Sequence, residues 1–209
     1  YLGEPLPYAV AQEIYLDMIP AEGSYINAGI WTIRLEPVVT VTGQYYLYLP
    51  AGSGIGESTG FYRATPQVTL TIPSTAAKVI TVGAYDQVYD TYADFSGRGY
   101  ADSTRTIGVA AAGLTKPDLV APGVNIQAPD VYGSFTPVTG TSFATPIVSG
   151  AAALLMEWGI VRGNDPFLYG EKIKAYLRKG ARPLKGEKEY PNDRVGYGKL
   201  CVAESLLEN

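Results

Sequence analysis

Hydrophobic and polar residues divide the chain into two parts with different patterns. In the first part, apolar and polar side chains alternate over residues 14–18, 31–36, 45–49 and 68–72. Alternation with a period of two is typical of a strand that buries one face. Glycine-containing turn sequences separate these segments. The spacing predicts antiparallel strands of a jelly roll over residues 1–75, and their number predicts a partial one with further strands upstream.

The second part, residues 76–209, has longer apolar runs. Residues 79–84 and 119–121 are almost continuously apolar, which indicates strands buried on both faces. Residues 142–158 are apolar at nearly every position and are too numerous for a strand. They predict a helix that is buried all round and ends at Gly159.

Two further helices are expected near the C-terminus. Asp165 followed by proline is a typical helix start, and the apolar spacing of Ile173, Tyr176 and Leu177 predicts a helix that ends near Gly180. A short helix is expected over residues 202–207. Strands that alternate with helices predict an α/β fold with a parallel sheet for residues 76–209.

Composition excludes several function classes. The net charge is −4, which disfavours nucleic acid and anionic membranes as partners. We find no apolar run of about 20 residues, and the polar, proline-interrupted start does not resemble a secretory signal. The chain starts at Tyr1, which suggests a processed or excised piece. Cys201 is the single cysteine, so we predict a buried helical residue there and no metal cluster.

The sequence contains no histidine. Histidine is the most common general base for nucleophilic catalysis near neutral pH. A nucleophile in this chain would therefore need a base of another kind, or a base from another polypeptide segment.

A candidate nucleophile lies where the long helix begins. Residues 140–146 read Gly-Thr-Ser-Phe-Ala-Thr-Pro. Ser142 would lie among the unpaired N–H groups of the first turn, and its own N–H could donate to an oxyanion. Gly140 permits a close approach, Ala144 is small enough for tight packing, and Pro146 is expected within the first turn. The alternative is that Ser142 only caps the helix.

This segment resembles the serine signature of the subtilases, Gly-Thr-Ser-x-Ala-x-Pro. Other subtilase-like segments follow in the family's order over residues 70–209. They are residues 80–84, 95–99, 116–124 and 195–200. The first 70 residues resemble the jelly-roll insertion of germination-associated subtilases of spore-forming bacteria. The resemblance implies the C-terminal part of a subtilisin-like parallel-sheet domain, preceded by a partial jelly roll.

The resemblance also implies roles for residues of the motif. Ser142 would be the nucleophile that forms an acyl-enzyme with a protein or peptide substrate, and the Thr141 hydroxyl would support the oxyanion hole. Phe143 would form a wall beside that hole. The family's triad aspartate and histidine precede everything in this sequence, so the isolated chain is expected to be inactive. We expect it to associate with an Asp/His-bearing half, or with itself, through exposed apolar surface.

Other assignments remain open at this stage. Lys78 or Lys116 could act as base in a Ser–Lys dyad, although both are predicted to be solvated charges beside strands. Asp118 matches a structural segment of the family. Asp90 and Asp94 could bind calcium, but a solvated loop is predicted, and we expect no metal or cofactor.

Two non-enzymatic functions compete with the protease prediction. One is a catalytically dead pseudoprotease that acts as a binding or regulatory protein. The other is a carbohydrate-binding jelly roll in which tyrosines of residues 1–62 form a platform. The family resemblance favours an extracellular or spore-associated location.

Overall fold

The structure, a computed structural model, describes residues 13–36, 38–39, 43, 45–49, 56, 58–99 and 115–206. Its contacts divide the chain into two units, with the division between Tyr62 and Arg63. This point precedes the predicted boundary at residue 75, because residues beyond 63 already bond within the second unit. The amide of Thr69, for example, donates to the carbonyl of Arg98 at 2.8 Å. The domain assignment itself stays a prediction.

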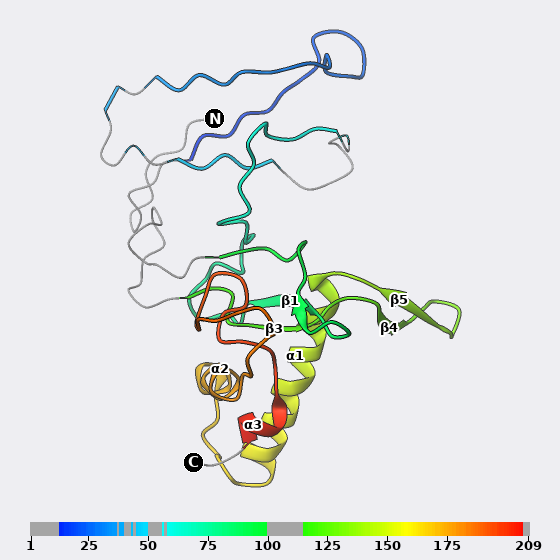
Figure 1. Ribbon diagram of the computed structural model, residues 1–209, viewed down its shortest axis with the longest axis vertical. Coiled ribbons are helices and arrows are strands. Elements are labelled where there is room, and N and C mark those ends of the chain that lie inside the picture. The colour runs from blue at the N-terminus through cyan, green and yellow to red at the C-terminus, as the bar shows by residue number, and fades with distance from the viewer. Residues whose placement is uncertain are drawn as a thin grey trace. The chain divides into compact units, whose positions relative to one another are not determined.

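The described residues of the second unit form two small sheets (Figure 1). The strands are β1 (Val82–Asp86), β2 (Thr91–Tyr92), β3 (Leu119–Pro122), β4 (Ile126–Pro129) and β5 (Phe135–Val138). In the first sheet the order is β2-β1-β3, with β1 parallel to β3 and antiparallel to β2. β4 and β5 form a separate antiparallel hairpin. The predicted apolar runs are therefore strands of a parallel pair, as expected.

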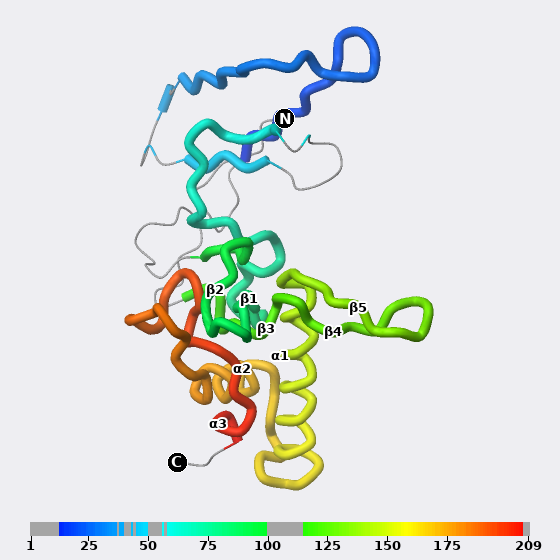
Figure 2. The backbone as a smooth tube through the Cα atoms, turned by 45° about the vertical axis from the view of Figure 1, so that its right-hand side comes forward, coloured from blue at the N-terminus to red at the C-terminus, as the bar shows by residue number. Residues whose placement is uncertain are grey.

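Helices cover this sheet. They are α1 (Thr141–Met156), its π-helical extension η1 (Glu157–Val161), α2 (Gly170–Lys179) and α3 (Val202–Leu206). α1 contacts β1 and β3, and α2 contacts α1 and α3. The tube in Figure 2 follows α1 away from the sheet as one long helix, with α2 and α3 to one side. Strands and helices together confirm the α/β class.

Two helix boundaries differ from the prediction. The helix that begins at Thr141 does not stop at Gly159 but continues through a π-helical turn to Val161, and Gly159 is buried within that turn beside Leu168. α2 begins at Gly170 and not at Asp165. The carboxylate of Asp165 binds side chains of α2, so it does not cap the helix start.

The composition of α1 predicted a helix that is buried on every side, and that prediction is wrong. Its buried residues are Ala144, Val148, Ala151 and Leu155, which pack against the sheet. Leu154 is 52 % exposed and Val161 is 78 % exposed, so the opposite side of the helix is open in this chain. The predicted absence of a run of about 20 apolar residues is also wrong. Residues 141–161 form one 21-residue helix that is long and apolar enough, by length and composition alone, to cross a membrane.

The described residues of the first unit form no β-strand. Ile14 makes an isolated bridge, and residues 31–36 and 45–49 have irregular backbone despite their alternating pattern. The same holds for residues 68–72 of the second unit. A half-buried strand requires a hydrogen-bonded neighbour and a covering layer, and Trp31, at 61 % exposure, has no such cover. The jelly roll stays a prediction.

The contact that positions α1 on the sheet lies at Gly123, just after β3. A Cβ atom on Gly123 would lie 2.6 Å from Cβ of Ala84 in β1 and 3.2 Å from the carbonyl oxygen of Gly140. The amide of Gly123 donates to the carbonyl of Tyr85 at 3.0 Å, and the carbonyl of Gly123 accepts a hydrogen bond from the amide of Gly140 at 2.8 Å. β1, the end of β3 and the start of α1 therefore meet at one glycine, which leaves no space for a side chain.

We predict that Gly123→Ala lowers the free energy of unfolding by about 2 kcal/mol, because the added methyl group forces backbone apart at this junction. The control is Gly150→Ala in α1, where nothing lies within 4 Å of the added atom. There, alanine should raise stability by about 0.5–1 kcal/mol through its higher helix propensity. Urea unfolding followed by far-UV circular dichroism measures both. Equal stability of Gly123→Ala and the native chain would contradict this packing.

Candidate active site

Ser142 is the second residue of α1 and is exposed to solvent. The residue before the helix is Gly140, with φ 152° and ψ 159°. Residues that carry a side chain rarely adopt this positive φ, so glycine allows the sharp change of direction from β5 into α1. The helix has no side-chain hydrogen bond at its N-cap. Ser142 therefore does not cap α1, and the capping alternative is wrong.

The backbone around Ser142 offers an unpaired donor. The amides of Phe143 and Ala144 both donate to the Gly140 carbonyl, at 3.1 and 3.4 Å. The Ser142 amide lies in the first turn, where no intrahelical acceptor exists, and among the described residues no hydrogen bond uses it. The N-terminal end of the helix dipole adds partial positive charge. This arrangement favours an anionic oxygen beside the Ser142 hydroxyl.

The neighbouring motif residues are placed as follows. Ala144 is fully buried against the junction at Gly123. The carbonyl of Thr141 accepts a hydrogen bond from the Thr145 hydroxyl at 3.0 Å. A role of the Thr141 hydroxyl in an oxyanion hole stays a prediction.

Pro146 is the sixth residue of α1, so the prediction that it lies in the first turn is wrong. Proline has no N–H, and the residue four positions earlier is Ser142. The carbonyl of Ser142 therefore receives no i→i+4 hydrogen bond. Both backbone groups of the candidate nucleophile are thus outside the helical ladder. The four-residue spacing in the sequence could have revealed this feature.

The described residues give the Ser142 hydroxyl no base. They contain no hydrogen bond between this hydroxyl and a lysine or a carboxylate, and the sequence contains no histidine. Lys78 is solvated, as predicted, with 83 % of its side chain exposed. Lys116 is not solvated, and that prediction is wrong because its whole side chain is buried.

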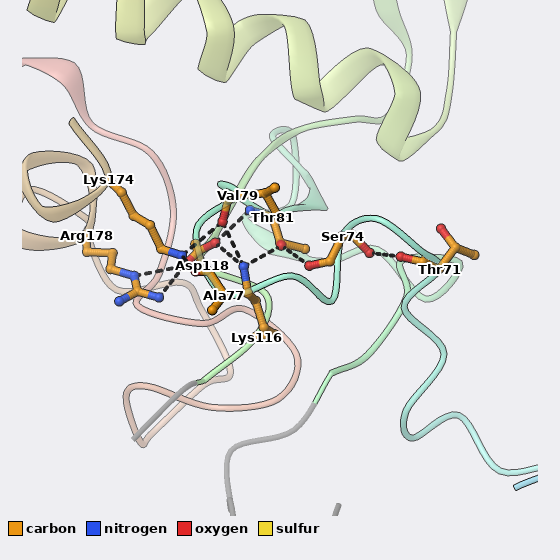
Figure 3. A network of polar contacts seen from close by, with 9 residues as sticks. All are labelled: Thr71, Ser74, Ala77, Val79, Thr81, Lys116, Asp118, Lys174 and Arg178. Atoms are coloured by element: carbon orange, nitrogen blue, oxygen red, sulfur yellow. Dashed lines mark hydrogen bonds and ion pairs between the residues drawn. The ribbon is translucent and has the colours of Figure 1, made fainter. Parts of the chain in front are cut away.

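Lys116 belongs to a buried ion cluster around Asp118 (Figure 3). Its ammonium donates to the Val79 carbonyl and the Thr81 hydroxyl, both at 2.8 Å, and to Asp118 Oδ2 at 3.0 Å. Burial lowers the pKa of the Lys116 ammonium from 10.5 to about 8, and the attraction of Asp118 offsets part of this effect. A lysine with such a pKa could serve as a base, but all its donors are directed to other groups.

Two cations from α2 complete the cluster. Lys174 lies 3.1 Å from Asp118 Oδ1, and Arg178 donates to the same oxygen through Nε, at 2.9 Å, and through Nη2. The Thr81 amide donates to Oδ2 at 2.6 Å. Asp118 therefore joins β3, the segment before β1, and α2. We predicted a structural segment for Asp118 but no role for Lys174 and Arg178. Their four-residue spacing places both on one face of a helix, and this was the available signal.

The remaining candidates have structural contacts. Asp90 lies in the turn between β1 and β2 and pairs with Lys199 at 2.6 Å, with part of its side chain still exposed, and Asp94 is exposed. Within the described ranges, no group of three or more Asp, Glu, Cys or His residues could hold a metal ion. Cys201 is half-buried and precedes α3, which corrects its predicted place inside a helix.

The subtilase-like segments also contact one another through the backbone. The amide of Val120 donates to the carbonyl of Gly198 at 2.9 Å, and the amide of Tyr197 donates to the carbonyl of Asp118 at 3.0 Å. The amide of Ala84 donates to the Ser96 hydroxyl at 3.0 Å. Segments that are far apart in the sequence thus form one structure around β1 and β3.

Comparisons with known proteins agree with this arrangement. Residues 53–198 match the subtilase family, Peptidase_S8. The chain is 34 % identical to the serine protease AprX of Bacillus subtilis over 139 residues, which are 57 % of this chain and 28 % of AprX. It is also 34 % identical to subtilisin BL of Lederbergia lenta over 116 residues, 56 % of this chain and 35 % of that protein.

Solved structures of proteases also match this chain. The CspB protease of Clostridium perfringens matches with a TM-score of 0.66 and 46 % identity, over 73 % of this chain and 31 % of CspB. The prenylagaramide maturation protease PagA matches with a TM-score of 0.53 and 32 % identity, over 68 % of this chain and 46 % of PagA. The chain thus spans about a third to a half of the relatives that it matches here. On its sequence and its fold, it belongs to the subtilase family of serine peptidases.

Proposed function

We propose that this chain supplies the nucleophile of a subtilisin-like serine endopeptidase. The observation that carries the proposal is the position of Ser142, exposed at the start of a core helix with its amide unpaired. In this mechanism, Ser142 Oγ attacks the carbonyl carbon of a peptide bond, and its proton passes to a general base. The base returns the proton to the leaving amine, and water then hydrolyses the acyl-enzyme.

The helix start supports the transition state. Attack on the carbonyl places negative charge on its oxygen, and the Ser142 amide is positioned to donate a hydrogen bond to that oxygen. The dipole of α1 contributes in the same direction. Because both groups are held in place by the packing of Ala144 at the Gly123 junction, they need no reorganisation during the reaction.

A base must come from outside the sequence. The chain contains no histidine, and Lys116 is bound within its own cluster. In subtilisin itself, loss of the base costs on the order of 10⁶ in rate. We therefore propose that an Asp- and His-bearing subtilase segment binds this chain, and that the chain alone is inactive.

Peptide hydrolysis tests this proposal. We expect no hydrolysis above background by the chain alone, and hydrolysis when it is mixed with an Asp/His-bearing half of the same precursor. Ser142→Ala should lower the rate of the mixture by a factor on the order of 10³ or more. The matched control is Ser149→Ala, on the same helix, whose hydroxyl donates to the Thr145 carbonyl. It should keep the rate within about twofold.

A stable complex that does not hydrolyse peptides would reject the enzymatic function. That result would favour the pseudoprotease, in which the fold serves binding or regulation. Hydrolysis that survives Ser142→Ala would assign the reaction to another nucleophile.

An apolar surface supports the proposed association. Leu154, Met156, Ile160 and Val161 of α1 and η1 are all substantially exposed. The buried residues of the same helix pack on β1 and β3, so this surface lies on the side away from the sheet. Exposed apolar side chains at this density are typical of interaction sites. We propose the Asp/His-bearing half as their partner, with self-association when that half is absent.

A double variant tests this surface. The double variant Leu154→Glu/Ile160→Glu should weaken binding of the Asp/His-bearing half by at least about tenfold, because each carboxylate would be desolvated at the interface. The control Val88→Glu changes an exposed apolar residue in the turn after β1. Isothermal titration calorimetry measures the affinities. Equal binding by both variants would remove this surface from the proposal.

The other parts of the proposal rest on the family resemblance. We propose proteins or peptides as substrates, without nucleic acid or membrane as a partner and without a cofactor. We also propose an extracellular or spore-associated site of action.

A further inference from the structure

The buried cluster around Asp118 carries more positive than negative charge. Three cations, Lys116, Lys174 and Arg178, contact one carboxylate, that of Asp118. Among the described residues, no second carboxylate joins this cluster, so two positive charges are unmatched. Buried charge without a counterion is unfavourable, because burial removes the hydration that stabilises it.

A cavity of about 210 Å³ opens beside this excess charge. One wall is a single face of α2, formed by Glu171, Lys174, Ala175 and Arg178, and the other is formed by Ala77 and Lys78. The volume is sufficient for several groups of the size of water. The cavity therefore connects the cations of the cluster with the solvent.

Arg178 has donors that Asp118 does not use. Nε and Nη2 bind Asp118, while Figure 3 shows the third guanidinium nitrogen without a dashed contact and directed away from the carboxylate. The guanidinium is held in place by stacking over the ring of Tyr197, with 4.8 Å between its central carbon and the ring centroid. Such a fixed planar group can bind an oxyanion in a defined geometry.

Lys78 is the third cation that lines the cavity, with Lys174 and Arg178. Its ammonium lies 4.0 Å from the Glu171 carboxylate, and both side chains are mostly exposed. This separation in solvent corresponds to a weak ion pair. Lys78 is therefore free to contact a more strongly charged anion.

We propose that the cavity between α2 and residues 77–78 binds a small doubly charged oxyanion of the phosphate or sulfate type. Arg178 and Lys78 bind its oxygens, and Lys174 and Lys116 contribute charge from behind. The site does not involve Ser142, so it is independent of the proposed peptidase activity.

Binding should depend on the protonation of Lys116. The groups that face its ammonium are Asp118, Lys174, the Thr81 hydroxyl and the Val79 carbonyl. The pKa of Lys116 is lowered to about 8, so the cluster loses one positive charge as the pH rises through that value. Anion binding should therefore be tighter below this pH than above it, and a bound anion should raise the pKa.

The test is a sulfate titration of the full 209-residue chain, followed by amide resonances in ¹H–¹⁵N NMR spectra. Sulfate keeps its charge across the pH range. Sodium chloride at equal ionic strength is the reference, since it screens charge without the oxyanion geometry. We expect saturable shifts at Lys78, Lys174 and Ala175, with weaker binding at about pH 9.5 than at about pH 7.

Two variants assign the site. Lys78→Gln should weaken sulfate binding by about fivefold, and Glu171→Gln should strengthen it, because they remove an attractive and a repulsive charge. Lys188→Gln, an exposed lysine that does not line the cavity, has the same charge change as Lys78→Gln and should bind as the native chain does. Shifts that do not saturate, shifts that chloride reproduces, or equal losses in Lys78→Gln and Lys188→Gln would overturn the proposal.

Discussion

The close backbone contact at Gly123 is the constraint on which the rest of the site depends. It brings β1, the end of β3 and the first turn of α1 together where no side chain fits, since an added Cβ would lie 2.6 Å from Ala84. The position of α1 is thereby fixed relative to the sheet. Because Gly140 bonds directly to Gly123, the turn that presents Ser142 is attached to the same point. Ser142 is exposed, but the backbone that carries it belongs to the core.

A second constraint is electrostatic and acts at the other end of β3, where Asp118 precedes the strand. Asp118 is fully buried, accepts hydrogen bonds from the Thr81 backbone, Lys116 and Arg178, and forms an ion pair with Lys174. Lys174 and Arg178 both lie on α2. The cluster attaches α2 to the sheet, whereas the apolar residues of α1 attach that helix. Breaking such a buried cluster by removing one partner leaves a charge without compensation, which is more harmful than losing a surface ion pair.

The sequence predicted the parts of the fold that local pattern determines. Parallel strands β1 and β3, the long helix at Ser142 and the end of α2 near Gly180 follow from apolar runs and glycine positions. The pattern failed where tertiary contacts decide. The sequence predicts a solvated Lys116, but in the structure its ammonium is buried and binds Asp118 and the Val79 carbonyl. The alternating segments of the first unit form no described strand, because alternation specifies a face to bury and not the neighbour that buries it.

The proposed nucleophile lies in this chain and the proposed base lies on another segment, and the most direct test addresses that division. A fluorophosphonate probe is added to the chain alone and to the chain mixed with an Asp/His-bearing subtilase half, and mass spectrometry locates the label. We expect labelling of Ser142 only in the mixture, since the Ser142 hydroxyl then acquires a base. Labelling of Ser142 in the isolated chain, or its absence in a stable complex, would contradict a nucleophile that depends on a base from another segment.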